Sequence, residues 1–146
     1  MVLRAAGRAT RAEDVEDLRD WLSSLPGGPA LSSTVVLACG QHGDDRPTWM
    51  YVEADAAAGV ARRRCLSCGF AVSILDSVTR WTYPPMWSCQ GCGHCIAELA
   101  AGISAPDGDT VEWVVLGARC VECGQVQGLT DFVLDAQPLP SVAVGL

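Results

Sequence analysis

Two short stretches in the second half of the chain decide how it folds: Cys89-Gln90-Gly91-Cys92-Gly93 and Arg119-Cys120-Val121-Glu122-Cys123-Gly124. In each, two cysteines separated by two residues can point at one ion only if the chain turns tightly beneath it. A glycine directly after the second cysteine supports that turn, because it accepts a positive φ and lets backbone amides face the sulfurs. Together the two stretches predict one four-cysteine metal site.

The first half of the chain contains a matching pair of stretches, Cys39-Gly40-Gln41-His42-Gly43 and Arg64-Cys65-Leu66-Ser67-Cys68-Gly69. The first stretch recurs after 50 positions (39 to 89) and the second after 55 (65 to 120). We interpret the halves as an internal duplication that differs by a five-residue insertion in the connecting hairpin. The predicted metal ligands are three cysteines with one histidine in the first half (Cys39, His42, Cys65, Cys68) and four cysteines in the second (Cys89, Cys92, Cys120, Cys123).

At these positions the sequence resembles the zinc-ribbon group, in which two CxxCG turns at the ends of β-hairpins hold a structural zinc. The resemblance covers residues 35–75 and 86–135. It implies a zinc-ribbon-like fold for each half and two zinc ions per chain. Because members of the group occur in transcription, translation, enzyme subunits and chaperones, the resemblance implies no single function.

Two further residues could join the second site, since His94 and Cys95 follow Cys92 closely. Cysteines that bind no metal are often buried as small hydrophobic residues, so we expect Cys95 in the core and His94 outside the site. A site of four cysteines also suits iron, so zinc and iron both remain open there. His42 argues against an iron electron-transfer site in the first half.

The expected fold is a small, metal-dependent, β-rich protein with an N-terminal helix and two tandem zinc-ribbon-like units. Thr10 and Glu13 are predicted to form a capping box, and Val15, Leu18, Leu22 and Leu25 fall at helical spacing as one apolar stripe. The predicted organisation is an amphipathic helix of about four turns with a linker (1–31), a first unit (32–80), a second unit (81–135) and a flexible tail (136–146).

Composition limits the classes of protein to consider. With 146 residues, 49% of them hydrophobic, the chain suits one compact domain or two small ones, and it is apolar enough to favour self-association or a protein partner. It has no apolar run of membrane-spanning length and no secretory signal, so we expect a cytoplasmic protein. In that reducing compartment eight cysteines indicate metal binding rather than disulfides.

Charge argues against a general nucleic-acid-binding role. The formal net charge is −7, and loading seven thiolates and two divalent ions brings it to about −10. Such a molecule repels phosphate backbones. The alternative is a local phosphate-binding patch at Arg62-Arg63-Arg64, whose simpler interpretation is that it offsets thiolate charge.

The expected function is a non-catalytic interaction module or adaptor within a larger assembly. Both predicted metal sites have four ligands, and the sequence contains no phosphate loop and no histidine paired with a nucleophile, so an enzyme is not expected. Trp81 to Trp87, with Pro84-Pro85, either joins the units or faces a partner; Trp49 and Trp113 are predicted core residues. The alternatives are a nucleic-acid-binding zinc-ribbon protein and a rubredoxin-like iron electron carrier.

Overall fold

A computed structural model describes residues 3–6, 9–25, 27–41 and 48–146, and the side chains among them from residue 11 onward. Its elements in chain order are β1 (Leu3–Ala6), β2 (Ala9–Ala12), α1 (Val15–Ser23), β3 (Ser33–Val36), β4 (Met50–Asp55), β5 (Val60–Cys65), β6 (Ala71–Ser73), the 3-10 helix η1 (Ser77–Arg80), β7 (Ala97–Ser104), β8 (Thr110–Cys120), β9 (Val126–Pro138) and α2 (Leu139–Gly145).

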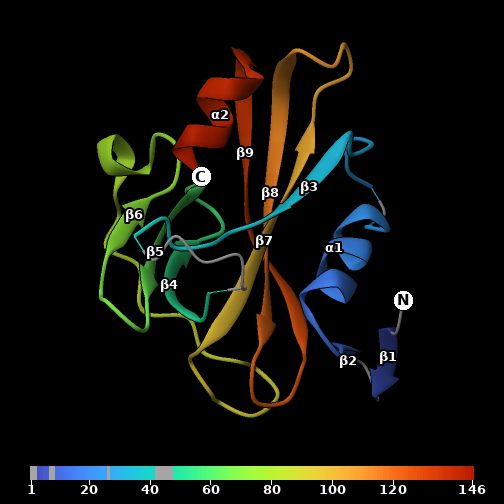
Figure 1. Ribbon diagram of the computed structural model, residues 1–146, viewed down its shortest axis with the longest axis vertical. Coiled ribbons are helices and arrows are strands. Elements are labelled where there is room, and N and C mark those ends of the chain that lie inside the picture. Colours follow the sequence, from blue (N-terminus) through green and yellow to red (C-terminus); the bar gives the residue numbers. More distant parts are fainter. Residues whose placement is uncertain (1–2, 7–8, 26, 42–47) are drawn as a thin grey trace.

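One seven-stranded antiparallel sheet contains both halves of the chain. Its strand order is β6-β5-β4-β7-β8-β9, and β3 pairs with β7 beside β4 (Figure 1). The first half joins the second where Met50 of β4 meets Ala97 of β7, and along β3, which pairs with residues 100–103. Strands β1 and β2 form a separate hairpin. The protein is thus β-rich, as predicted, with its two halves in one sheet.

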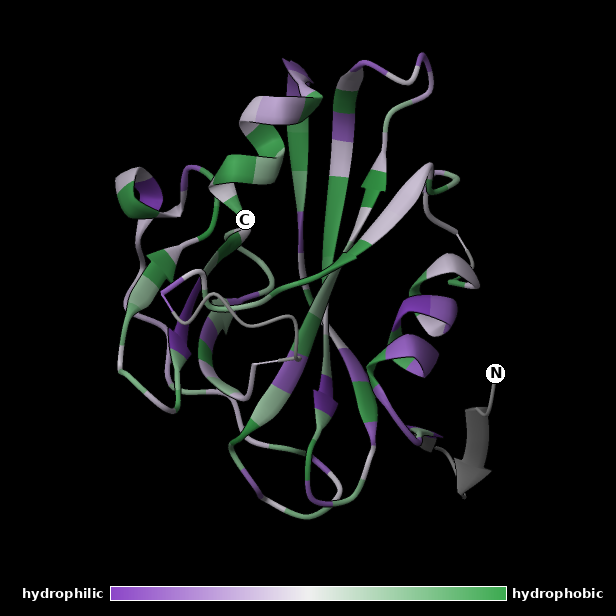
Figure 2. Ribbon diagram, in the orientation of Figure 1, coloured by the Kyte–Doolittle hydropathy of each residue, from purple (hydrophilic) through white to green (hydrophobic). Residues whose placement is uncertain are grey.

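Helix α1 packs on one face of this sheet. Leu18 and Leu22 are fully buried there, beside Ala100 and Val115. Gly117 of β8 permits the close approach, because a Cβ atom at that position would lie 2.9 Å from Cδ2 of Leu22. Figure 2 shows hydrophilic residues along the remainder of the helix surface, as an amphipathic helix requires.

The helix begins later than the predicted capping box places it. Asp14 is the N-cap residue, and its Oδ1 accepts a hydrogen bond of 2.9 Å from the amide of Asp17. Thr10 lies in β2, where pairing with β1 and a bridge between Arg11 and Gln125 keep the backbone extended. The helix is therefore nine residues long, about two and a half turns rather than four.

The opposite face of the sheet carries the larger core, which draws on both halves. Met50 and Val52 of β4 pack with Leu99 of β7 and Leu116 of β8 in one cluster, together with Cys89 and Cys120. The tip of the β4–β5 hairpin reaches β9, since Oγ1 of Thr130 lies 3.4 Å from the carbonyl oxygen of Asp55. The two halves thus share a single hydrophobic core.

Residues 136–146 differ from the predicted flexible tail. They complete β9 and form α2, and Val142 and Leu146 are buried in the core. The amide of Leu75 donates to the carbonyl oxygen of Gly145 at 2.8 Å, which fastens the helix to the first half. Pro140 is compatible with this helix because it lies in the first turn, where a backbone donor is not needed.

The segment from Trp81 to Trp87, which connects the halves, packs against both of them and also exposes side chains. The buried Trp87 donates its indole N–H to Oε1 of Gln127 at 3.2 Å, and its amide donates to Val52 at 2.8 Å. Tyr83, by contrast, is 86% exposed. Trp49 is 52% exposed and Trp113 is half-buried, so the prediction that both fill the core is wrong for Trp49.

In the part of the chain that the structure describes, no helix is both long enough and apolar enough to span a membrane.

Packing of α1 can be tested with Leu18→Ala, which removes a fully buried side chain. We expect a loss of about 2–5 kcal/mol in the free energy of unfolding, because the substitution leaves a cavity between helix and sheet. Asp20→Ala, on the exposed side of the same helix, should change it by less than about 0.5 kcal/mol. Denaturant unfolding of the metal-loaded protein measures both; equal losses would show that α1 is not packed this way.

Candidate metal centres

The four cysteines of the second half form one cluster. The sulfurs of Cys89, Cys92, Cys120 and Cys123 all lie within 4.8 Å of one another. The Cys89–Cys123 sulfur distance is 3.5 Å and the Cys92–Cys120 distance is 3.6 Å. A tetrahedral ion with metal–sulfur bonds of about 2.3 Å has sulfur–sulfur edges of about 3.8 Å, whereas a disulfide bond is about 2.05 Å. The cluster fits a metal ion and not disulfide bonds.

The same backbone turn carries the cysteines at three places. In the second half, the amide of Cys89 donates to the carbonyl oxygen of His94 at 2.7 Å, and that of Gly93 donates to Cys89 at 2.8 Å. The corresponding two bonds are present at Cys65 and at Cys120. The glycine after each second cysteine has a positive φ, as the sequence predicts: Gly69 at 76°, Gly93 at 78° and Gly124 at 78°.

Strand register brings the two turns of each half together. Cys120 is the last residue of β8 and pairs with Ala97, the first residue of β7. In the first half, Cys65 ends β5 opposite Met50, where β4 begins. Each hairpin therefore places its second cysteine turn beside the turn that precedes its first strand, and a cluster forms at that end.

The first half brings Cys39, Cys65 and Cys68 together, with 3.7 Å between the sulfurs of Cys39 and Cys68. The amide of Cys39 donates to Oγ1 of Thr48 at 2.8 Å, which holds the entering chain. Three thiols supply three of the four ligands of a tetrahedral site. The predicted fourth, His42, lies outside the described residues, and so does Gly43. Both clusters could hold a metal ion.

His94 and Cys95 belong to neither cluster among the described residues. Cys95 is half-buried rather than fully buried. His94 contributes its backbone carbonyl to the turn of Cys89. The structure therefore groups Cys89, Cys92, Cys120 and Cys123 without either residue.

Burial and amide donors act in opposite directions on the thiols. Burial raises the pKa of Cys39, Cys120 and Cys123. At Cys89 burial acts in the same direction, but hydrogen bonds from the amides of Cys92 and Gly91 help to bring its pKa below the usual value. The Gly91 amide nitrogen lies 3.3 Å from Sγ of Cys89. Amides aimed at a sulfur stabilise the thiolate that a metal requires.

Two of the three consecutive arginines, Arg62 and Arg63, are engaged within the protein. Arg62 forms a two-pronged ion pair with Glu53, at 2.8 and 2.9 Å, and its guanidinium lies 4.6 Å from the ring centre of Trp81. Arg63 is buried and donates to the carbonyl oxygen of Leu146 at 2.7 Å. Burial lowers the pKa of Arg63. Arg64 alone is exposed, so Arg62–Arg64 form no continuous cationic surface.

A segment before α1 packs on one of the two turns of the second cluster, Cys120–Gly124, which sequence reasoning missed. The amide of Ala12 donates to the carbonyl oxygen of Gly124 at 2.7 Å, and Nη1 of Arg11 donates to that of Cys123 at 3.0 Å. Arg119 donates to the carbonyl oxygen of Ala12 at 2.9 Å and pairs with the buried Glu98 at 2.7 Å. No motif near residue 11 indicates these contacts, because Ala12 takes part only through its backbone amide and carbonyl groups.

No protein-family model matches the chain, and neither the curated proteins nor the solved structures include one with significant similarity to it.

The turn glycines allow a matched test of this covering segment. Gly93→Ala and Gly124→Ala both place an alanine at a φ of 78°, which costs about 1–2 kcal/mol. At Gly124 the new Cβ would also lie 2.5 Å from the carbonyl oxygen of Ala12, whereas at Gly93 no atom lies within 4 Å. We expect Gly124→Ala to lower the unfolding free energy of the metal-loaded protein clearly more than Gly93→Ala. Equal losses would place residues 11–13 elsewhere.

Proposed function

We propose that the chain is a non-catalytic protein-interaction module with one structural zinc ion in each cysteine cluster. The observation that carries the proposal is a set of large apolar side chains exposed beside the first cluster. Trp49 is 52% exposed, Phe70 47% and Leu66 36%. We call these three residues the knuckle patch. Aromatic residues of this kind are enriched in the cores of protein interfaces.

The metal-binding turn itself holds the knuckle patch. The amide of Leu66 donates to the carbonyl oxygen of Trp49 at 2.9 Å, and the amide of Cys65 donates to that of Phe70 at 3.0 Å. Leu66 lies between the ligands Cys65 and Cys68. An ion bound by Cys39, Cys65 and Cys68 would therefore fix the backbone that carries all three side chains. This coupling supports a role in which metal binding orders an interaction surface.

Zinc is the metal that the donor set supports best. Three thiols with a predicted histidine make a common structural zinc site, and four thiols make another. Iron in a rubredoxin-like site is the alternative at the second cluster. Closed four-ligand sites support a structural role rather than a catalytic one.

An origin by duplication is supported by the strand registers. Arg64 pairs with Ala71 in the first half, and Arg119 pairs with Val126 in the second, so the 55-residue offset continues into the strands that follow. The hairpins differ more than predicted. Met50 precedes its partner Cys65 by 15 positions, whereas Ala97 precedes Cys120 by 23. The second hairpin is therefore eight positions longer. The segment from Cys89 to Ala97 is three positions shorter than the matching segment from Cys39 to Met50.

A nucleic-acid-binding role receives less support. The formal net charge of the chain is −7, and binding to phosphate backbones depends on a cationic surface. Of the three consecutive arginines, Arg62 is paired with Glu53 and Arg63 is buried. Arg64 remains exposed but bonds the carbonyl oxygen of Gly69 at 3.1 Å.

Metal content tests the first part of the proposal. We expect elemental analysis of untagged protein to give two zinc ions per chain. Cys120→Ser should lower this to one, because it removes a ligand from one cluster only. Cys95→Ser, outside both clusters, should keep two. Since each structural zinc contributes on the order of 10 kcal/mol to folding, chelation should also abolish the cooperative thermal transition. A red, redox-active protein would instead assign iron to the second cluster.

The knuckle patch is tested by site-specific cross-linking. With a benzophenone side chain in place of Phe70, we expect the zinc-loaded protein to form one discrete adduct, either with a partner or with a second copy. The adduct should disappear on chelation and in a Trp49→Ser background, because both remove the ordered surface. The same probe in place of Val144, which is 87% exposed on α2, should give no such adduct. The same adducts from both positions would contradict the proposal.

A further inference from the structure

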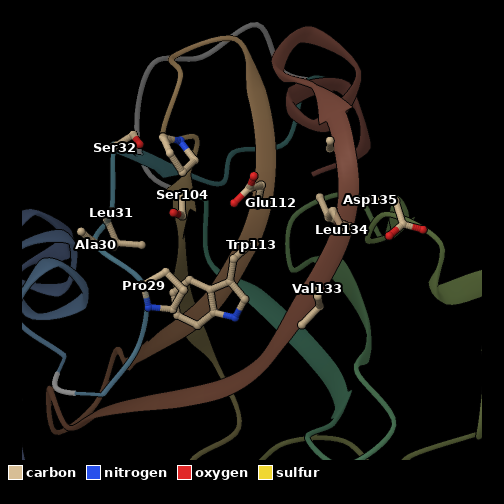
Figure 3. A pocket seen from close by; sticks show the side chains of 12 residues that line it. Pro29, Ala30, Leu31, Ser32, Ser104, Glu112, Trp113, Val133, Leu134 and Asp135 are labelled. Atoms are coloured by element: carbon tan, nitrogen blue, oxygen red, sulfur yellow. The ribbon is translucent and has the colours of Figure 1, made fainter.

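A groove of about 840 Å3 lies beside the β8–β9 pair, away from both cysteine clusters (Figure 3). One wall is the chain that follows α1, residues 29–32, and the other is β9 at residues 133–136. Between them lie Ser104 at the end of β7 and Glu112 and Trp113 of β8. The volume is typical of sites for small organic ligands, which are commonly about 300–1,000 Å3.

A β-bulge shapes one wall of this groove. Val111 pairs with Gln137 and Trp113 with Val133, so Glu112 faces three residues of β9, Leu134 to Ala136. Ala136 takes a left-handed conformation with φ 46° to accommodate them. Bulges bend a strand and redirect its side chains, and they are frequent beside binding sites.

Two polar side chains that line the groove, those of Ser104 and Glu112, have no side-chain partner among the described residues. Ser104 is only 3% exposed, yet its hydroxyl makes no hydrogen bond to any residue that the structure describes. The Glu112 carboxylate likewise forms no ion pair within the described part of the chain. Ser104 pairs with Trp113, the residue next to Glu112. Oγ of Ser104 remains accessible to solvent, so it is available to a ligand as a hydrogen-bond acceptor.

Figure 3 shows how these side chains are directed. The Glu112 carboxylate lies on the Ser104 side of β8, within the groove, whereas the Asp135 carboxylate points away on the far side of β9. The Trp113 ring extends toward Pro29. The ring is held in place because its indole N–H donates to Oδ2 of Asp131 at 2.7 Å. Trp113 therefore offers a fixed aromatic platform next to one unpaired negative charge.

We propose that this groove binds a small organic cation with a flat apolar body, of the class of aryl amidines and aryl amines. The cationic N–H groups donate to the Glu112 carboxylate and to Oγ of Ser104, and the apolar body lies on Trp113 between Leu31 and Val133. The acidic net charge of −7 favours approach of such a ligand. This activity goes beyond the proposed interaction function, since the groove shares no residue with the knuckle patch.

The charge requirement can be tested on the zinc-loaded protein with three probes of nearly equal shape: benzamidine, benzamide and benzoate. We expect saturable binding of benzamidine by calorimetry, together with a shift of the Trp113 indole resonance. Benzamide should bind at least about tenfold more weakly, because it carries no charge to pair with Glu112. Benzoate should not bind measurably. Equal affinities for benzamidine and benzamide, or no saturable binding of benzamidine, would overturn the proposal.

Three isosteric or minimal variants locate the site. Glu112→Gln should weaken benzamidine binding about tenfold or more, and Ser104→Ala about three- to fivefold, because each removes one hydrogen-bond partner of the cation. Asp135→Asn removes the same charge from one wall of the groove, but that carboxylate points away on the far side of β9, so it should leave the affinity within about twofold. If Asp135→Asn weakens binding as much as Glu112→Gln, the cation is attracted by net charge only, and the proposal fails.

Discussion

Cys120 ends β8 directly opposite Ala97, where β7 begins, and this register determines where the second cluster forms. Because neighbouring strands are hydrogen-bonded along their length, the turn before β7 and the turn after β8 must emerge at the same end of the hairpin. This register alone brings Cys89 and Cys92 to the same end of the hairpin as Cys120 and Cys123. The pairing of Met50 with Cys65 has the same consequence for the first cluster.

The shared sheet makes the two clusters parts of one folding unit. A hairpin of two strands is marginally stable alone, and the four strands of the first half or the three of the second would each expose apolar surface without the other half. Joining the halves at β4, β3 and β7 lets Met50 and Val52 pack with Leu99 and Leu116 in one core. The core includes Cys89 and Cys120, so loss of metal at the second cluster would be felt by the first half as well. The same core also holds α2 through Val142.

The sequence was most informative where a local turn imposes a residue type. The CxxCG spacing predicted the groups of thiols and the positive φ of Gly69, Gly93 and Gly124 because these depend on a few consecutive residues. It was least informative about long-range contacts. Val142 and Leu146 give no periodic pattern long enough to indicate a buried helix, and the extended backbone at Thr10 depends on pairing with β1. The β9 bulge and the groove likewise depend on pairing between distant residues.

The difference between the two clusters explains why the first is the better candidate for a contact surface. In the second half, Gln125 directly follows the turn Cys120–Gly124, and it forms a β-bridge with Arg11. In the first half, Phe70 holds the same position after the turn Cys65–Gly69. The carbonyl oxygen of Gly124, at the end of the turn Cys120–Gly124, accepts a hydrogen bond from the amide of Ala12.

At the equivalent place in the first half, the one described residue that donates to the carbonyl oxygen of Gly69 is Arg64, through its side chain, and Phe70 is exposed. The turn Cys120–Gly124 is thus covered by an extended segment of the same chain. The turn Cys65–Gly69 has no such cover among the described residues. An extended segment of another chain, with apolar residues that contact Trp49 and Phe70, would cover the turn Cys65–Gly69 as residues 11–13 cover the turn Cys120–Gly124. This difference between two otherwise equivalent turns is the physical argument for the proposed interaction module.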